Sequence, residues 1–411
     1  MAATGREFFT AKTVAEALAD FRPSHRTATE TVALNDAAGR IPAADILAGE
    51  ALPGFDRSSV DGYAVRAQDT FGASESIPAY LALTGSVAMG ASADVALLAH
   101  SAIAVPTGGA LPHGADAVVM IEYTQEAMAG TIEVVRPVAP GEGIVRADED
   151  MAPGQAAVPA GAPLRAQDIA MLAALGITEL AVHGRPTVSI LATGDELIAP
   201  DAGPVGPGQV RDALSSSVGA LVREAGGRPH PPQIVADDPR ALHDALGQAL
   251  AHSDVVVICA GSSVGARDET AATVAAIAGT EIWCHGLAIK PGKPTLLAAS
   301  DGIPIIGLPG NPRSALVVFR LIGTPLVRRA GGWSAEHHTA STPRRLSRDL
   351  PSAAGRLDVV QVRLSGDEEA EPIFGPSALL SVLTAADGYV IVPEDANGLS
   401  AGETLEVFLY R

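Results

Sequence analysis

Short apolar runs alternate with amphipathic segments between residues 185 and 330. Strand-like apolar runs lie at 188–192, 254–259 and 304–307, and segments with helical spacing lie at 215–225, 240–251, 271–277 and 313–327. Such alternation is typical of a parallel sheet covered by helices on both faces. We therefore expect an α/β domain here, with ligands bound beyond the carboxyl ends of its strands.

The pattern differs on either side of this region. Helical spacing recurs at 10–21 and 166–175, whereas residues 53–143 form short apolar runs broken by Gly and Pro. Broken runs of this kind predict a β-rich module. Three further apolar runs predict a small C-terminal β domain; they lie at 356–364, 388–393 and 404–409.

Length and charge narrow the class of protein. A chain of 411 residues is too long for one core, so we expect about two to four domains. The net charge is −19 and no basic run occurs, which argues against nucleic-acid binding.

Prolines and glycines interrupt the charge-free residues 95–115, so no membrane span is expected. The charged N-terminal residues lack a signal peptide's apolar core, which favours a cytoplasmic protein. Cys259 and Cys284 lack zinc-site spacing and are interpreted as buried thiols.

Lysine is rare in this chain. Only Lys12, Lys290 and Lys293 occur, and the other permanently charged cations are arginines. Two of the three lie in Lys-Pro-Gly-Lys-Pro at 290–294, where proline limits flexibility and glycine lets backbone amides approach a ligand. Ammonium groups retained here suggest an oxyanion site, the alternative being two solvated loop lysines. The segment does not fit a Walker A loop.

A second proline-glycine segment, at 308–312, leads from a predicted strand into a predicted helix. Asn311 stands near the helix cap and Pro312 near its first turn. Amides at such a turn can bind phosphate. A purely structural cap is the alternative.

Several carboxylates stand in predicted loops. They are Asp61, Asp195, Glu196 and Asp268. Beside anion-binding lysines, carboxylates suit a divalent cation that bridges phosphate oxygens. Taken singly, Asp195 or Asp268 could merely cap a helix.

Seven segments, in chain order, resemble the molybdopterin molybdenumtransferase family, which comprises the bacterial MoeA proteins and the E domain of gephyrin and its plant counterparts. They are FDRSSVDGYAV at 55–65, TGGALP at 107–112, ADEDM at 147–151, TGDEL at 193–197, SVGARDET at 263–270, KPGKP at 290–294 and LPGNPRSA at 308–315. The last two together are highly specific. The resemblance extends from about Phe8 to the C-terminus.

The resemblance implies a homodimer of elongated, four-domain α/β subunits. Domain I would be discontinuous, at 1–52 and 145–184, and a β-rich domain II would be inserted in it at 53–144. Domain III, at 185–330, would be a parallel-sheet α/β domain like those of MoaB and Mog proteins and would bind molybdopterin. Domain IV, at 331–411, would be a small, barrel-like β domain.

The resemblance also implies an enzyme of the last step of molybdenum cofactor synthesis. Members take adenylylated molybdopterin and molybdate, insert the metal at the dithiolene and release AMP in a Mg²⁺-dependent hydrolysis. An adenylyltransferase would supply the substrate, and apo-molybdoenzymes or their chaperones would receive the product. Neither a nucleic acid nor a membrane is an expected partner.

Matching positions carry the family's roles onto this chain. Lys290 and Lys293, with Arg356 or Ser377, would hold molybdate. Asp195, Glu196 and Asp268 would position Mg²⁺, and Asp61 would join these residues in catalysis. The matches expected in cofactor binding are Thr107, Asp150, Asp212, Ser263, Gly265, Pro309, Gly310, Asn311 and Pro312.

The chain also departs from the family pattern, at Arg57, Leu214, Ser262, Arg313 and Gln361. Family members often have Arg at position 361 and a small apolar residue at 313. These departures bear on pocket shape more than on reaction class. The alternatives are a divergent paralogue that acts as a carrier or scaffold or uses tungstate, and an unrelated nucleotide hydrolase. The hydrolase is disfavoured because its usual phosphate-binding and nucleophile motifs do not occur.

Overall fold

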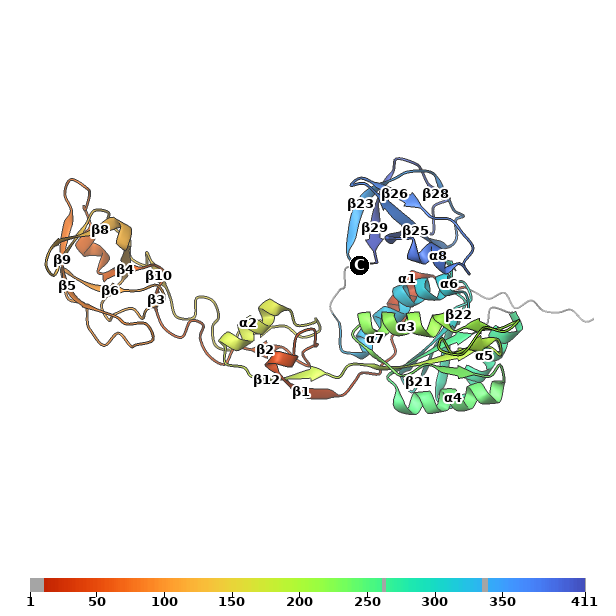
Figure 1. The fold of residues 1–411 in the computed structure, drawn as a ribbon. Helices are drawn as coiled ribbons and strands as arrows, with labels where there is room; N and C mark the ends of the chain where they lie inside the picture. Colours follow the sequence, from red (N-terminus) through yellow and green to blue (C-terminus); the bar gives the residue numbers. More distant parts are fainter. Residues whose placement is uncertain (1–10, 261–263, 335–338, 411) are drawn as a thin grey trace, which may run out of the picture.

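The computed structural model describes residues 11–260, 264–334 and 339–410, with 264–268 described as backbone only. Figure 1 shows a β-rich lobe at one end, a small middle lobe with α2 (Ala166–Ala174), and an α/β lobe beside a β-barrel at the other end. The predicted fold class, an elongated multidomain α/β protein, is confirmed. None of the helices in the described ranges is long and apolar enough to cross a bilayer.

The middle lobe is built from two distant chain segments. β1 (Thr29–Ala33) pairs antiparallel with β12 (Glu179–His183), and β2 (Ile46–Leu47) pairs with β11 (Ala156–Val158). Apolar side chains of both segments share one small core with α2. The chain therefore leaves this lobe, forms the β-rich lobe and returns.

The β-rich lobe contains a six-stranded sheet in the order β7-β4-β6-β5-β9-β8. Its strands are β4 (Gly62–Val65), β5 (Ala79–Ser86), β6 (Ser101–Val105), β7 (Ala117–Met120), β8 (Thr124–Met128) and β9 (Thr131–Val134). β3 (Arg57–Ser58) and β10 (Ile144–Val145) pair where the chain enters and leaves. Two apolar cores lie within this lobe.

The α/β lobe has a seven-stranded sheet whose centre is parallel. β13 (Thr187–Thr193), β18 (Val255–Ala260) and β22 (Ile303–Pro309) run side by side in that order, with β16 (Arg228–Pro229) and β17 (Gln233–Val235) beside β13. The apolar runs of β13, β18 and β22 are buried because helices cover both faces. One face carries α3 (Ala213–Glu224), α6 (Pro312–Val318), α7 (Thr324–Ala330) and α1 (Val14–Asp20), and the other carries α4 (Pro239–His252) and α5 (Val264–Ala276).

The far edge of this sheet differs from the parallel sheet that was predicted. β21 (Leu296–Ser300) and β19 (Thr280–His285) run antiparallel, so the sheet is mixed rather than parallel throughout. β21 and β22 form a hairpin whose turn residues, Asp301 and Gly302, have φ of 47° and 84°. Two successive positive φ values make the tight turn that Asp-Gly favours, and this turn reverses the chain without a crossover.

The helix predicted over 313–327 is interrupted. α6 ends at Val318, a π-helical turn (η4) spans Phe319–Gly323, and α7 begins at Thr324. Pro325 lies in the first turn of α7 and has no N–H for the α-helical ladder. The π-helical turn falls directly before this break.

The C-terminal domain is a closed barrel, as predicted. β25 (Leu357–Ser365) pairs with both β26 and β27, and β23 and β29 complete the circle. The other strands are β23 (Ser341–Leu346), β26 (Glu369–Pro372), β27 (Gly388–Val392) and β29 (Thr404–Leu409). β20 (Ile289–Lys290), from the α/β lobe, adds to the barrel at β25.

Candidate functional site

Lys290 lies where the α/β lobe meets the barrel. β20 pairs in parallel with β25, so that Ile289 is opposite Leu357 and Lys290 is opposite Asp358. The backbone amide of Leu357 donates to the carbonyl of Ala288 at 2.9 Å. The lysine loop is therefore fixed to the barrel through its main chain.

Asp358 brings two predicted site residues together. Its side chain is only 3% exposed; Oδ2 lies 3.5 Å from Nζ of Lys290, and Oδ1 accepts a hydrogen bond from Nε of Arg356 at 2.8 Å. A buried carboxylate is tolerated when charged partners compensate it. Sequence reasoning missed Asp358, although an acid inside an apolar strand was a signal for it.

Lys290 and Asp358 border a cavity of about 220 Å³, whereas Arg356 is not among its lining residues. Its lining includes Lys290 and Asp358, Gln361 of β25, and Arg313 of α6. The backbone amide of Arg313 donates to the carbonyl of Ser377 at 3.2 Å, which places Ser377 beside the same region. Two departures from the family pattern, Arg313 and Gln361, thus face one cavity.

Lys293 lies three residues further along the loop, is exposed, and does not line this cavity. The loop between the lysines requires glycine. Gly292 has a φ of 124°, and a Cβ there would lie 2.4 Å from Cγ2 of Val318. The hydroxyl of Thr295 donates to the carbonyl of Gly292 at 2.7 Å. Glycine therefore allows the loop to pack tightly against α6.

The segment 308–312 forms the predicted strand-to-helix turn. β22 ends at Pro309, Gly310 follows, Asn311 is at the N-cap position and Pro312 begins α6. The side chain of Asn311 makes no capping hydrogen bond, so helix capping alone does not explain why asparagine occurs at this position. The turn places Arg313, in the first turn of α6, at the wall of the cavity.

Acidic side chains gather beyond the carboxyl end of β13. Oδ1 of Asp195 accepts from the backbone amide of Asp237 at 3.1 Å. The Glu196 carboxylate folds back over Gly194, where a Cβ would lie 2.6 Å from Oε2.

Asp212 acts as the N-cap of α3. It is buried and accepts from the amide of Ser215 at 2.9 Å. Burial, and then the charge of Asp212, raise the pKa of the Cys259 thiol. Cys259 and Cys284 are buried free thiols, as predicted.

Three more residues of the predicted metal and cofactor set are Ser263, Gly265 and Asp268. Ser263 is outside the described residues, and Gly265 and Asp268 are described as backbone only. Among the side chains that are described, no group of three or more His, Cys, Asp or Glu residues is placed to hold a metal ion. The set of Asp195, Glu196 and Asp268 therefore stays a prediction.

Asp61, Thr107 and Asp150 lie away from the lysines. Oδ1 of Asp61 accepts from the amide of Thr107 at 2.7 Å, and this backbone hydrogen bond lowers the pKa of Asp61. The amide of Asp150 donates to the carbonyl of Leu52 at the base of the β-rich lobe. Figure 1 shows this lobe and the α/β lobe at opposite ends of the elongated molecule. Within one chain, these residues do not join the Lys290 cavity.

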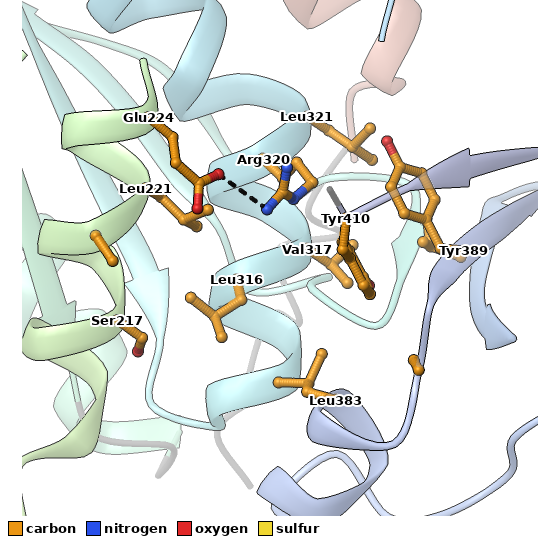
Figure 2. Close-up of a pocket in the computed structure, with 13 residues that line it drawn as sticks. Ser217, Leu221, Glu224, Leu316, Val317, Arg320, Leu321, Leu383, Tyr389 and Tyr410 are labelled. Atoms are coloured by element: carbon orange, nitrogen blue, oxygen red, sulfur yellow. Dashed lines mark hydrogen bonds and ion pairs between the residues drawn. The ribbon is translucent and has the colours of Figure 1, made fainter. Parts of the chain in front are cut away.

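A larger cavity, of about 310 Å³, lies between α3, α6 and the barrel (Figure 2). Its lining is mainly apolar. Its cation, Arg320, lies 3.3 Å from Glu224 and stacks on Tyr410 with 5.1 Å to the ring centroid. This cation is already compensated, so the cavity does not suit an oxyanion.

Another cavity, of about 230 Å³, lies between the middle and α/β lobes and is rich in arginine. Its arginines are Arg40, Arg185, Arg223 and Arg328. Arg223 and Arg328 occupy the last turns of α3 and α7, where the helix dipole stabilises a cation. No residue of the predicted site lines this cavity.

Comparison with known proteins gives one consistent result. Family models match three regions: the MoeA N-terminal region (domain I and II) at 12–176, a "Probable molybdopterin binding domain" at 189–329, and the MoeA C-terminal region (domain IV) at 343–410. The molybdopterin molybdenumtransferase of Haemophilus influenzae is 31% identical over 93% of this chain and 94% of its own length. That of Bacillus subtilis is 31% identical over 93% of this chain and 90% of its own length. The crystal structure of the molybdopterin biosynthesis MoeA protein of Pyrococcus horikoshii is 32% identical, has a TM-score of 0.84, and covers 97% of this chain and 100% of that one. The chain therefore belongs to the MoeA family of molybdopterin molybdenumtransferases.

Proposed function

We propose that this chain inserts molybdenum from molybdate into adenylylated molybdopterin and releases AMP. The observation that carries the proposal is the pairing of Lys290 and Arg356 on the buried carboxylate of Asp358, since Lys290 and Asp358 themselves line a cavity of about 220 Å³. Family membership supports the reaction class. The cavity offers cations and space for the oxyanion.

The two cations have complementary tasks. Molybdate is a tetrahedral dianion whose oxygens accept hydrogen bonds. Lys290 offers three donors on a flexible stem, and Arg356 offers a planar fork, so together they can orient the oxyanion through charge-assisted hydrogen bonds. Asp358 keeps both cationic groups at the site and reduces their mutual repulsion. Lys293 and Ser377 would complete the oxyanion site.

The carboxylates suit a divalent cation in kind, and the order of the strands supports a shared location for them. Asp195 and Glu196 follow β13, and Asp268 lies in the helix after β18. β13 and β18 are parallel neighbours, so their carboxyl ends share one edge of the sheet. Carboxylate oxygens are the ligands that Mg²⁺ prefers, and Mg²⁺ bound there would supply Lewis-acid stabilisation of phosphate charge.

The β-rich lobe supports a homodimeric site. Asp61 and Thr107 match functional positions of the family. Their lobe, however, lies at the opposite end of the molecule from the α/β lobe that carries Lys290 (Figure 1). Residues so far apart in one chain can act together only across two copies. In a homodimer with twofold symmetry, the β-rich lobe of each copy would complete the site of the other.

The proposed partners follow from this reaction. An adenylyltransferase would hand over adenylylated molybdopterin, and apo-molybdoenzymes or their chaperones would accept the product. The cytoplasmic location remains a prediction from the sequence.

A turnover assay tests the proposal. Purified protein is given adenylylated molybdopterin and Mg²⁺, with or without molybdate, and AMP is measured. Release that depends on molybdate supports the function. A carrier or scaffold would release no AMP, and a general nucleotide hydrolase would release it equally without molybdate.

A further inference from the structure

Arg313 is a cation that the predicted oxyanion site did not include. It lies near the start of α6 and lines the same cavity as Lys290 and Asp358. It approaches from the α/β lobe, whereas Asp358 belongs to the barrel. Groups of both domains thus line the cavity, with Lys290 and Arg313 from the α/β lobe and Asp358 from the barrel.

The contacts of Arg313 leave its charge uncompensated. Nη1 donates to the carbonyl of Gly375 at 2.8 Å. Nε is buried and has no hydrogen-bond partner among the described residues. No carboxylate in the described part of the chain forms an ion pair with this guanidinium, and burial lowers the pKa of Arg313. An arginine nevertheless stays protonated in proteins, so a half-buried positive charge faces the cavity.

The charges around the cavity add up to a dianion site. Lys290, Arg313 and Asp358 line the cavity, and Arg356, which is not among the lining residues, is paired with Asp358. Together these four groups carry three positive charges and one negative charge. Arg348, which stacks on Phe374 of the cavity lining, lies 3.8 Å from Glu371 and is compensated by it. The surplus is therefore two positive charges, the opposite of the charge of molybdate.

We propose that Arg313 is a third cationic ligand of the molybdate site, contributed across the domain junction from α6. It binds a molybdate oxygen through charge-assisted hydrogen bonds while Gly375 fixes the guanidinium. This inference rests on the proposed function, because molybdate is the expected occupant of the cavity.

Gln361 provides an internal test of this role. It lines the same cavity from β25, it is fully buried, and its Oε1 has no hydrogen-bond partner among the described residues. Its Nε2 is 3.4 Å from the hydroxyl of Tyr410. An arginine placed at position 361 would therefore bring a guanidinium into the cavity from the barrel side.

The experiment compares Arg313→Ala, Arg313→Lys and the double variant Arg313→Ala/Gln361→Arg with the wild type. Molybdate binding is measured by calorimetry, and AMP release is measured against the concentration of molybdate and, separately, of adenylylated molybdopterin. A hydrogen bond to a charged group predicts that Arg313→Ala weakens molybdate binding and raises its KM by about tenfold or more. The KM for adenylylated molybdopterin should stay unchanged. Arg345→Ala is the matched control, because Arg345 is an exposed barrel arginine paired with Glu368.

The results separate binding from a structural role. Partial recovery in Arg313→Lys, or recovery in the double variant, supports a ligand role. Wild-type molybdate affinity in Arg313→Ala would overturn it. A loss of stability with no selective change in molybdate affinity would also overturn it, because Arg313 would then only hold the Gly375 loop. If the wild type binds molybdate but releases no AMP, the proposed function fails while the binding data still decide the role of Arg313.

Discussion

The ammonium of Lys290 lies 3.5 Å from the buried carboxylate of Asp358, its opposite residue in the parallel pairing of β20 and β25. This contact joins a loop of the α/β lobe to a strand of the barrel. Arg356, two residues before Asp358 in sequence, binds the other carboxylate oxygen. Strand pairing between two domains therefore assembles the proposed oxyanion site.

Asp358→Asn should loosen this assembly without changing its shape. The amide keeps the size of the carboxylate but loses the charge that positions Lys290 and Arg356, so we expect the KM for molybdate to rise by about tenfold. Because both cations are partly exposed, the free energy of unfolding, measured in urea, should fall by only about 1–3 kcal/mol. A molybdate dependence identical to that of the wild type would show that Asp358 does not position the cations.

The two loop lysines should be needed for turnover but not for folding. Lys290→Ala and Lys293→Ala should each abolish molybdate-dependent AMP release, because each removes an exposed ammonium group from the oxyanion site. Circular dichroism should show unchanged folding. Lys12→Ala is the control, since the Lys12 side chain lies beside Glu16 and Trp283 and does not line the cavity. Normal release by both loop variants would remove the basis for the oxyanion site.

Asp268→Asn should separate metal use from substrate binding. Losing one carboxylate weakens a Mg²⁺ site, so turnover should require more Mg²⁺. Binding of adenylylated molybdopterin should change less. The measurement is a Mg²⁺ titration of AMP release beside a direct binding assay. Wild-type rates across the whole titration would rule out a metal role for Asp268.

A site shared between copies predicts complementation. Asp61→Ala and Lys290→Ala should each inactivate their own homodimer, since every site lacks one residue. After the two variants are mixed, unfolded and refolded together, half of the dimers should be mixed and have one intact site each, which restores about a quarter of wild-type activity. No recovery, although mixed dimers are shown to form, would mean that both residues act within one chain or that Asp61 is not required.

Much of the fold could be predicted because burial leaves a local pattern. Fully buried strands such as β18 are continuous apolar runs, and helices such as α3 repeat their apolar residues with helical spacing. The antiparallel edge was missed because only residues 304–307 were interpreted as a strand. The turn at Asp301 and Gly302 was visible in the sequence, but the register on either side depends on tertiary packing.

The site was less predictable because its contacts are not local. Lys290 and Lys293 stood out through the scarcity of lysine, and Arg356 was added only by resemblance. Nothing in the spacing indicates that a strand at 289–290 pairs with one that begins at Leu357, so the role of Asp358 became visible only in the folded chain. Arg313 was noticed as a departure, and its meaning depends on the same domain junction.

The most direct measurement of the central claim is a single turnover in which both products are counted. Adenylylated molybdopterin is incubated with the protein, Mg²⁺ and molybdate, and the AMP released is compared with the molybdenum bound to the pterin product. We expect equal amounts of the two, and no AMP when molybdate is left out. AMP formed without molybdenum in the pterin would contradict it.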